Sequence, residues 1–337
     1  MDKRQNGETR GMKKRVGNFC LCSFLMAVCT LSVLVSGCGL RTASSANTKP
    51  VVKEYTKGQI MVVAATERNR YQNVYTNRLW SVTADQSGNT FEQLLQRQIE
   101  QFLEELAAVN LLAQEQKTEL TSQEKDCVKS LSEEYYLGLT EGDKAYMGAS
   151  QEEIYDLYCQ YYLADKVAAQ LTDSREMEVS DAEAKVIQVQ RIELSDRDRA
   201  DSVLAQVRQE KADFAAIAAK NSLDSQTTFS LEWDKNMDSL TQASFNLNQD
   251  EISEPIEWNG HFYIVKCISA YDADATAARK SRLQLERKAQ IFKQIFEPFS
   301  RENAVKLKDG IWNEVDFSAG EDCTSDNFFQ LYHETCS

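Results

Sequence analysis

Helical periodicity in two separated stretches constrains the fold of this chain more than any other feature. Apolar residues recur at steps of three and four through residues 60–172, most regularly over 91–106. The same spacing returns over 273–303. With only 13 glycines and three prolines in 337 residues, long helices meet few breaks. Each amphipathic helix must cover its apolar face, so we expect the late helix to pack on the early ones.

Local signals mark the ends of several helices. A serine or threonine followed three residues later by glutamine or glutamate predicts capping boxes at Thr90 with Gln93, Thr121 with Glu124 and Ser150 with Glu153. Pro298 should end or kink the late helix, because its ring cannot continue the hydrogen-bond ladder. Residues 304–337 form a short tail, with one strand expected through Ile311, Val315 and Phe317.

The segment between the two helical stretches has a different pattern. Residues 186–194 alternate in the manner of a strand, and two short helical patterns follow, over 200–207 and 213–220. A second strand is expected over 263–266. The sequence therefore predicts a mainly α fold with an inserted α+β domain.

The first 37 residues have the layout of a secretory signal. Six basic side chains precede residue 16, and residues 19–35 form an uncharged run of 17, shorter than the roughly 20 that span a bilayer. The following Leu-Val-Ser-Gly-Cys at 34–38 resembles a bacterial lipobox, which implies cleavage before Cys38 and a diacylglyceryl group on its sulfur. An uncleaved anchor or an ordinary signal is the alternative. We expect a lipid-anchored protein on the extracytoplasmic face of the cell membrane.

Charge and histidine content exclude several classes of function. The net charge is −14, and without residues 1–37, which hold six basic and two acidic side chains, 32 basic and 50 acidic ones leave −18. Such a chain repels phosphate backbones and anionic headgroups, so no nucleic-acid partner is expected and the lipid must provide the anchoring. With only two histidines and no cysteine pair at metal spacing, neither a metal site nor a cofactor is expected.

Five cysteines follow Cys38. Cys127, Cys159 and Cys267 lie in apolar periodic segments and are interpreted as buried thiols. Cys323 and Cys336 are close enough in sequence to close a short loop in an oxidising compartment, and whether they pair is left open.

An ordered set of short motifs carries a family resemblance. Ser222-Leu223-Asp224, Leu231 with Trp233, Met237, Ala243-Ser244-Phe245, Glu251-Ile252-Ser253 and Ile264-Val265-Lys266 occur in the order of the parvulin-type (PpiC) peptidyl-prolyl cis-trans isomerase domain. With the lipobox and the flanking helices, the whole chain resembles the extracytoplasmic foldases of the PrsA/SurA type. The resemblance implies that the partners are unfolded or newly secreted polypeptides.

Departures from the family's pattern fall on the residues that carry its chemistry. The two histidines of parvulins correspond to Arg191 and Tyr263, while Asp224 keeps its position. These three are the candidate catalytic residues, and Met237, Leu240 and Phe245 are the candidate substrate-binding slot. Arg191 brings a permanent charge that needs a partner, and Asp224 is the obvious one. Alternatively, Asp224 only caps its loop.

We therefore interpret the chain as a membrane-anchored folding factor of the parvulin class. Catalysis either persists, with substituted residues, or has weakened so that the protein mainly holds clients. The aromatic residues of 60–172 are either core or a cradle for apolar client segments. The alternative from another class is an extracellular ligand-binding lipoprotein, although the alternating βα pattern of such receptors is missing.

The domain boundaries follow from these patterns. We expect a signal peptide over 1–37, a tether over 38–58, a helical chaperone domain over 59–180, a parvulin-like domain over 181–271, a helix completing the helical domain over 272–303, and the tail over 304–337.

Overall fold

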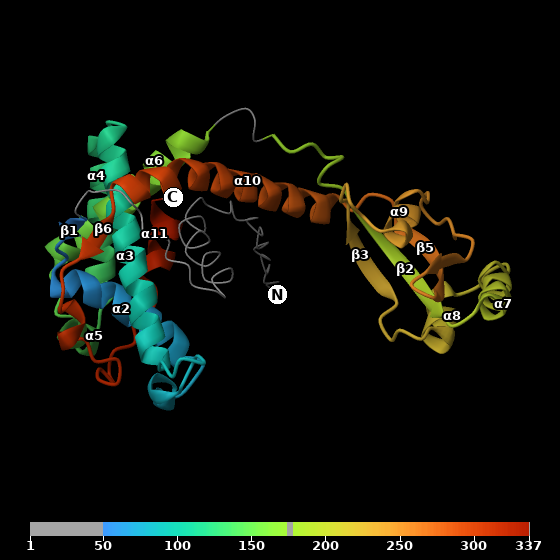
Figure 1. Ribbon diagram of the computed structural model, residues 1–337, viewed down its shortest axis with the longest axis horizontal. Helices are drawn as coiled ribbons and strands as arrows, with labels where there is room; N and C mark the ends of the chain where they lie inside the picture. The colour runs from blue at the N-terminus through green and yellow to red at the C-terminus, as the bar shows by residue number, and fades with distance from the viewer. Residues whose placement is uncertain (1–49, 174–177, 337) are drawn as a thin grey trace, which may run out of the picture. The chain divides into compact units, whose positions relative to one another are not determined.

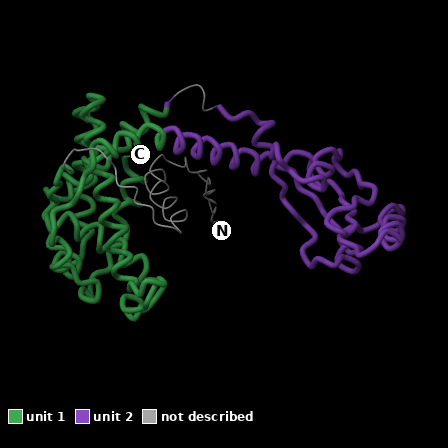
Figure 2. The backbone as a smooth tube through the Cα atoms, viewed as in Figure 1, with its two compact units in different colours: residues 1–172, 292–337 green, residues 173–291 purple. Residues whose placement is uncertain are grey.

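The computed structural model describes residues 50–173 and 178–336. These residues form two compact units, shown in different colours in Figure 2. The first unit contains the described residues up to Thr172 together with those from Phe292 onward, and the second runs from Asp173 to Ile291. The fold is mainly α with an inserted α+β segment, as predicted. The predicted signal peptide and Cys38 lie outside the described residues.

Helices build the first unit (Figure 1). In chain order they are α2 (Lys57–Gln72), the 3-10 helix η1 (Asn77–Ser81), α3 (Phe91–Glu115), α4 (Ser122–Gly138), α5 (Glu141–Met147) and α6 (Gln151–Thr172). The predicted capping boxes are confirmed at the starts of α3, α4 and α6. Two more open α2, at Thr56 with Gln59, and α5, at Thr140 with Asp143.

Aromatic residues of α6 pack on the chain's own C-terminal helix, α11 (Phe328–Thr335). Tyr158 of α6 stacks on Phe328 with ring centroids 4.1 Å apart, and Tyr161 meets Tyr332 edge-on at 4.8 Å. All four rings are buried. They are core residues here, so the aromatic cradle considered for clients is already filled from within the chain.

Helix α10 (Ala273–Glu302) contributes to both units, because the boundary between them falls after Ile291. Phe292 and Phe296 are buried and stack 5.5 Å apart in the part that belongs to the first unit. The part before residue 292 belongs to the second unit, whereas we had expected all of 272–303 to complete the helical domain. Pro298 does not end the helix, which continues to Glu302.

Strands form where the sequence predicted a tether and a tail. Val51–Lys53 (β1) pairs in parallel with Val305–Leu307 (β6), so the expected tether over 38–58 is too long. The tail strand expected through Ile311, Val315 and Phe317 is wrong, since Ile311–Glu314 is the 3-10 helix η3. The β1–β6 pair was missed because a strand is stabilised by its partner, and here the partner lies some 250 residues away along the chain.

The cysteine expectations are partly wrong. Cys336, at the end of α11, forms a disulfide with Cys127 of α4, because α11 packs against that helix. Cys323 is a free, buried thiol, and Asn69 donates to its sulfur at 3.4 Å. Cys159 and Cys267 are free as predicted, Cys159 only half-buried.

A four-stranded antiparallel sheet forms the centre of the second unit. Its order is β3 (Thr228–Glu232), β2 (Val186–Leu194), β5 (His261–Ser269), β4 (Ile256–Trp258). Helices α7 (Arg197–Val207) and α8 (Phe214–Asn221) cover one face, packing on Ile192 and Ile264. The opposite face carries α9 (Ser239–Phe245), which packs through Leu240 on Ile187 and Val265. The site described below lies on the α9 face of the sheet.

The start of α10 docks on this sheet through arginines. Arg279 is 9% exposed and donates to the carbonyl oxygens of Glu183, Lys185 and Trp233, at 3.1, 3.1 and 2.5 Å. Arg282 forms an ion pair with Glu232 at 2.6 Å. Within the described ranges, none of the helices is both long and apolar enough to cross a bilayer.

Candidate active site

Alternation along β2 brings two charged side chains to the α9 face. Arg191 and Glu193 alternate with buried Ile192 and Leu194, which point to the opposite face. On the neighbouring strand β5, Tyr263 lies directly opposite Glu193. Because cross-strand partners share a face, the three polar residues are neighbours.

The Arg191 guanidinium lies against aromatic rings. Its central carbon is 4.0 Å from the ring centroid of Phe229 on β3 and 5.3 Å from that of Tyr263. Its Nη2 lies 3.5 Å from Oδ2 of Asp224, an ion pair with both side chains partly buried. The Nε atom is buried and has no hydrogen-bond partner among the described residues. One end of the guanidinium is thus paired while a donor at the other end is unused.

The loop that carries Asp224 is bound to β2 through Glu193. The Leu223 N–H donates to the Glu193 carbonyl at 2.9 Å, and Ser222 Oγ accepts from the Glu193 N–H at 3.1 Å. Asp224 Oδ1 accepts from the Gln226 N–H at 2.9 Å. The expected pairing of Asp224 with Arg191 is therefore confirmed, and the same carboxylate also caps its loop.

Tyr263 is held in a protonated state. It is 4% exposed, and burial together with the neighbouring Glu193 carboxylate raises the pKa of its hydroxyl above the ordinary 10.0. The hydroxyl therefore remains a hydrogen-bond donor at neutral pH. His261, two residues earlier on β5, pairs through Nδ1 with the same Glu193 carboxylate. Glu193 thus links the only histidine of the second unit to Tyr263.

Two of the three predicted slot residues meet beside Tyr263. Leu240 is buried on α9, and half-buried Phe245 packs on the same cluster, with Val189 and Val265 below it. Met237 precedes α9 and is not part of this cluster. Lys185 Nζ lies 5.8 Å from the Phe245 ring centroid. An apolar cluster and an arginine with an unused donor therefore lie on one face of the sheet.

A comparison with protein-family models agrees with this geometry. Residues 190–269 match the model of the PPIC-type PPIase domain, a rotamase. The second unit carries a parvulin-type domain. The match confirms the resemblance drawn from the ordered motifs, and it includes Arg191, Asp224, Tyr263 and the slot residues.

Several solved structures of foldases are similar to this chain at low identity. Foldase protein PrsA from Streptococcus pneumoniae is 18% identical, with 68% of this chain and 96% of that chain covered and a TM-score of 0.25. PrsA from Bacillus subtilis is 17% identical, with 68% and 95% covered and a TM-score of 0.25. Peptidylprolyl isomerase PrsA from Bacillus cereus is 17% identical, with 74% and 97% covered and a TM-score of 0.35. No curated protein matches this chain.

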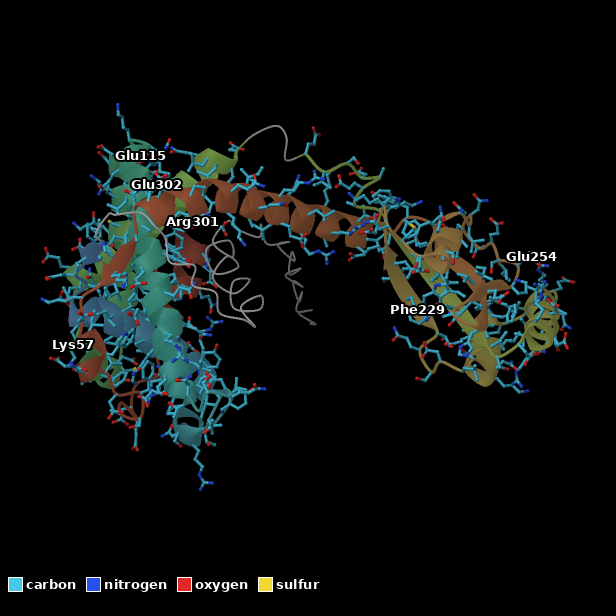
Figure 3. The ribbon with its side chains drawn as sticks, in the orientation of Figure 1. Lys57, Glu115, Phe229, Glu254, Arg301 and Glu302 are labelled. Carbon is cyan, nitrogen blue, oxygen red and sulfur yellow. A yellow bond between two sulfur atoms is a disulfide. The ribbon has the colours of Figure 1, made fainter. Side chains whose placement is uncertain are left out.

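Two residues of the parvulin-type domain were missed by sequence reasoning. Glu193 connects His261, Tyr263 and the Asp224 loop, and its spacing of two from Arg191 could have placed it on the same strand face. Phe229, labelled on β3 in Figure 3, supports the guanidinium where the family has glycine. An aromatic residue that can contact an arginine on the neighbouring strand is the signal that could have identified Phe229.

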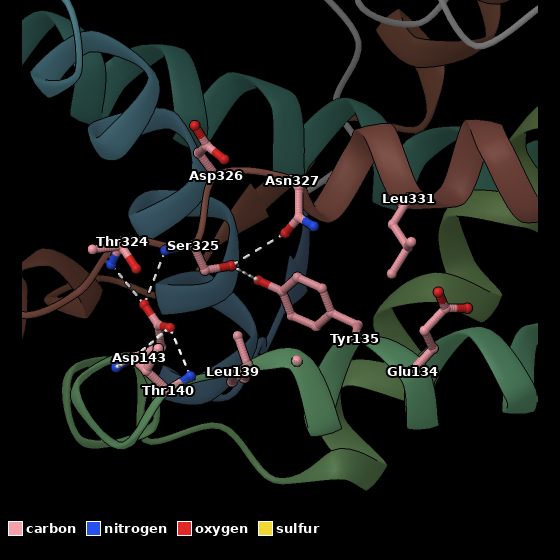
Figure 4. Close-up of a pocket in the computed structure, with 11 residues that line it drawn as sticks. Glu134, Tyr135, Leu139, Thr140, Asp143, Thr324, Ser325, Asp326, Asn327 and Leu331 are labelled. Carbon is pink, nitrogen blue, oxygen red and sulfur yellow. Dashed lines mark hydrogen bonds between the residues drawn. The ribbon is translucent and has the colours of Figure 1, made fainter.

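A separate cavity lies in the first unit, away from these residues. It has a volume of about 370 Å³ and lies between the end of α4, α5 and the segment before α11 (Figure 4). Asp143 at its wall accepts hydrogen bonds from Thr140, Thr324 and Ser325, so this carboxylate ties α5 to the C-terminal segment. In the part of the chain that the structure describes, no group of three His, Cys, Asp or Glu could hold a metal ion.

Proposed function

We propose that this protein is a membrane-anchored, extracytoplasmic folding factor of the parvulin class that holds clients better than it isomerises their prolines. One observation carries the proposal. Within the segment that matches the PPIC-type model, an apolar cluster lies beside the Arg191 guanidinium, whose Nε is buried and has no partner among the described residues. The predicted lipidation of Cys38 supplies the anchor.

The chemistry required is modest. Turning an X–Pro bond meets a barrier of about 20 kcal/mol, because amide resonance must be broken, and no covalent bond to the protein is needed. A catalyst must favour the twisted amide over the planar ones. An apolar slot for the proline ring and a donor for the prolyl nitrogen, which becomes more basic as the amide twists, suffice in principle.

Each residue has a proposed role. Leu240 and Phe245 receive the prolyl ring. Met237, which lies outside this cluster, stays a candidate from the sequence alone. Arg191 donates to the client carbonyl through an unused N–H group, and Asp224 fixes the guanidinium from one side. The Tyr263 hydroxyl donates to Glu193, and its ring lines the site.

The same geometry suggests why catalysis is weakened. The slot is apolar and rewards binding at roughly 25 cal/mol per Å² of buried surface. The carbonyl oxygen is more negative in the planar amide than in the twisted one, so a guanidinium bound to that oxygen holds the client without favouring the twisted state. Binding that is equal for both states leaves the rate of rotation unchanged.

Two assays on the purified protein test the proposal. It should suppress the aggregation of an unfolded client and show weak or no activity in a protease-coupled isomerisation assay on proline tetrapeptides. Asp224→Ala should leave holding nearly intact, as should Glu210→Ala, an exposed control in the same unit. If the wild type isomerises proline peptides rapidly and Asp224→Ala abolishes this activity, the proposal of weakened catalysis is wrong. If the protein binds no unfolded client, the proposed function as a folding factor is wrong.

A further inference from the structure

Strand β3 has a free edge. It is the first strand in the sheet order and pairs only with β2. Two main-chain hydrogen bonds mark the ends of the pairing between β3 and β2. The Arg191 N–H donates to the Thr227 carbonyl oxygen at 2.8 Å, and the Trp233 N–H donates to the Lys185 carbonyl oxygen at 2.9 Å. In an antiparallel pair of strands, hydrogen-bonded and non-hydrogen-bonded residue pairs alternate. Since Thr227 and Trp233 are hydrogen-bonded to Arg191 and Lys185, the odd-numbered residues between them also form main-chain hydrogen bonds with β2. The main-chain groups of Ser230 and Glu232 therefore point away from the sheet, and no hydrogen bond among the described residues uses them.

Apart from α10, whose Arg279 and Arg282 hold the Glu232 side chain at one end, this edge lacks the devices that usually block pairing. Native proteins protect edge strands with proline, lysine, bulges or very short length. The opposite edge strand, β4, is only three residues long and follows Pro255. In contrast, β3 has five residues, Thr-Phe-Ser-Leu-Glu, with neither proline nor lysine, and no register shift in its pairing. The edge next to the candidate site is the one left open.

Alternation links the free groups to the slot. Phe229 and Leu231 turn their side chains to the α9 face, where they pack on the cluster that holds Leu240 and Tyr263. A strand added antiparallel to β3 would bond to Ser230 and Glu232, and its residues beside Phe229 and Leu231 would direct their side chains to that same face. Those residues would also direct their own N–H away from β3. Proline, which has no N–H, is tolerated only at such positions.

We propose that β3 binds a client segment in extended conformation as an added antiparallel strand, with the residue before proline paired to Ser230 and the proline beside Phe229. The inference rests on the proposed function and names how the client is held. In this alignment the residue directly before proline pairs with Ser230, and the residue three positions before proline pairs with Glu232. The residues after it pass Thr228, where β3 ends, and are free to turn. The X–Pro bond then lies beside the Phe229 ring and the Arg191 guanidinium, which are 4.0 Å apart.

Main-chain pairing also explains how one site accepts many sequences. Hydrogen bonds to backbone groups carry no sequence information, so a client needs only an extended segment that ends in proline. The slot side chains then select for an apolar ring at one position.

The first test uses two modified peptides on the unmodified protein. Each peptide contains one proline after four β-branched residues and carries a single backbone N-methyl group. In the first peptide the methyl group is on the residue directly before proline. In the second it is on the residue two positions before proline. The first should weaken binding about tenfold, because its N–H pairs with Ser230, and the second should change it less than twofold. Equal effects of the two peptides would overturn the proposal.

The second test uses variants of Ser230. Ser230→Pro removes an N–H that β2 does not use, whereas Ser230→Ala keeps it and serves as the control. Peptide binding should fall about tenfold in the first only. Hydrogen exchange should show that peptide protects the Ser230 and Glu232 amides. If the protein holds clients, yet Ser230→Pro binds peptide normally and no edge amide is protected, the strand-addition proposal fails while the proposed function stands. A wild type that binds no peptide overturns both.

Discussion

Arg191 and Asp224 are joined through one carboxylate oxygen, 3.5 Å from Nη2, while the other oxygen caps the loop at Gln226. The two interactions of this carboxylate can be separated. Asparagine keeps an oxygen for the cap and loses the charge, whereas alanine loses both.

Substitutions at Asp224 should therefore differ in their effect on the second unit. We expect Asp224→Asn to lower its free energy of unfolding by about 1 kcal/mol, the scale of a partly exposed ion pair, and Asp224→Ala by about 2 kcal/mol. Urea-dependent hydrogen exchange of β2 and β5 amides measures both. Equal losses in the two variants would mean that the loop cap contributes nothing.

Lipidation of Cys38 remains a prediction from the sequence. The motive is the Leu-Val-Ser-Gly-Cys boundary at the end of an apolar run too short to span a bilayer comfortably. Cys38→Ala should leave unprocessed precursor and abolish labelling with a radioactive fatty acid, while Cys22→Ala should do neither. Normal labelling of Cys38→Ala would show that the anchor is elsewhere.

The sequence predicted what depends on local pattern. Alternation located β2, the three capping boxes mark real helix starts, and the ordered motifs placed Arg191, Asp224 and Tyr263 correctly enough to predict an ion pair. Each of these depends on residues a few positions apart or on an alignment with a known domain.

What the sequence did not predict depends on distant partners. Cys336 lies 209 positions from Cys127, which we had interpreted as a buried thiol, and the only partner considered for Cys336 was the nearer Cys323. The pairing of β1 with β6 and the packing of α11 on the tyrosines of α6 also depend on distant partners. Helical spacing shows which face of a helix is apolar but leaves open which segment covers it.

Asp143 should make the first unit sensitive to acid. Burial alone would raise the pKa of its carboxyl, but hydrogen bonds from Thr140, Thr324 and Ser325 outweigh burial and hold the pKa below the ordinary 3.8. Because the folded pKa is the lower one, this stabilisation is fully present above pH 3.8 and is lost as the pH falls through the folded value. Asp143→Asn should lower the free energy of unfolding of the first unit by about 2 kcal/mol at neutral pH. It should also reduce the loss of stability that the first unit shows as the pH falls. Thermal melts between pH 2 and 7 measure this, and an unchanged acid limb would contradict it.

Reduction of the Cys127–Cys336 disulfide should destabilise the first unit without releasing α11. The bond closes a very long loop, so its loss frees much conformational entropy in the unfolded chain, about 2–5 kcal/mol. Phe328, Phe329 and Tyr332 remain buried against α4 and α6 and continue to hold the helix. We expect a reducing agent to lower the melting temperature of the first unit and to leave hydrogen exchange in β2 and β5 of the second unit unchanged. The double variant Cys127→Ser with Cys336→Ser should have the melting temperature of the reduced protein, and the reducing agent should not change it. If the agent lowers its melting temperature as well, another cysteine is responsible.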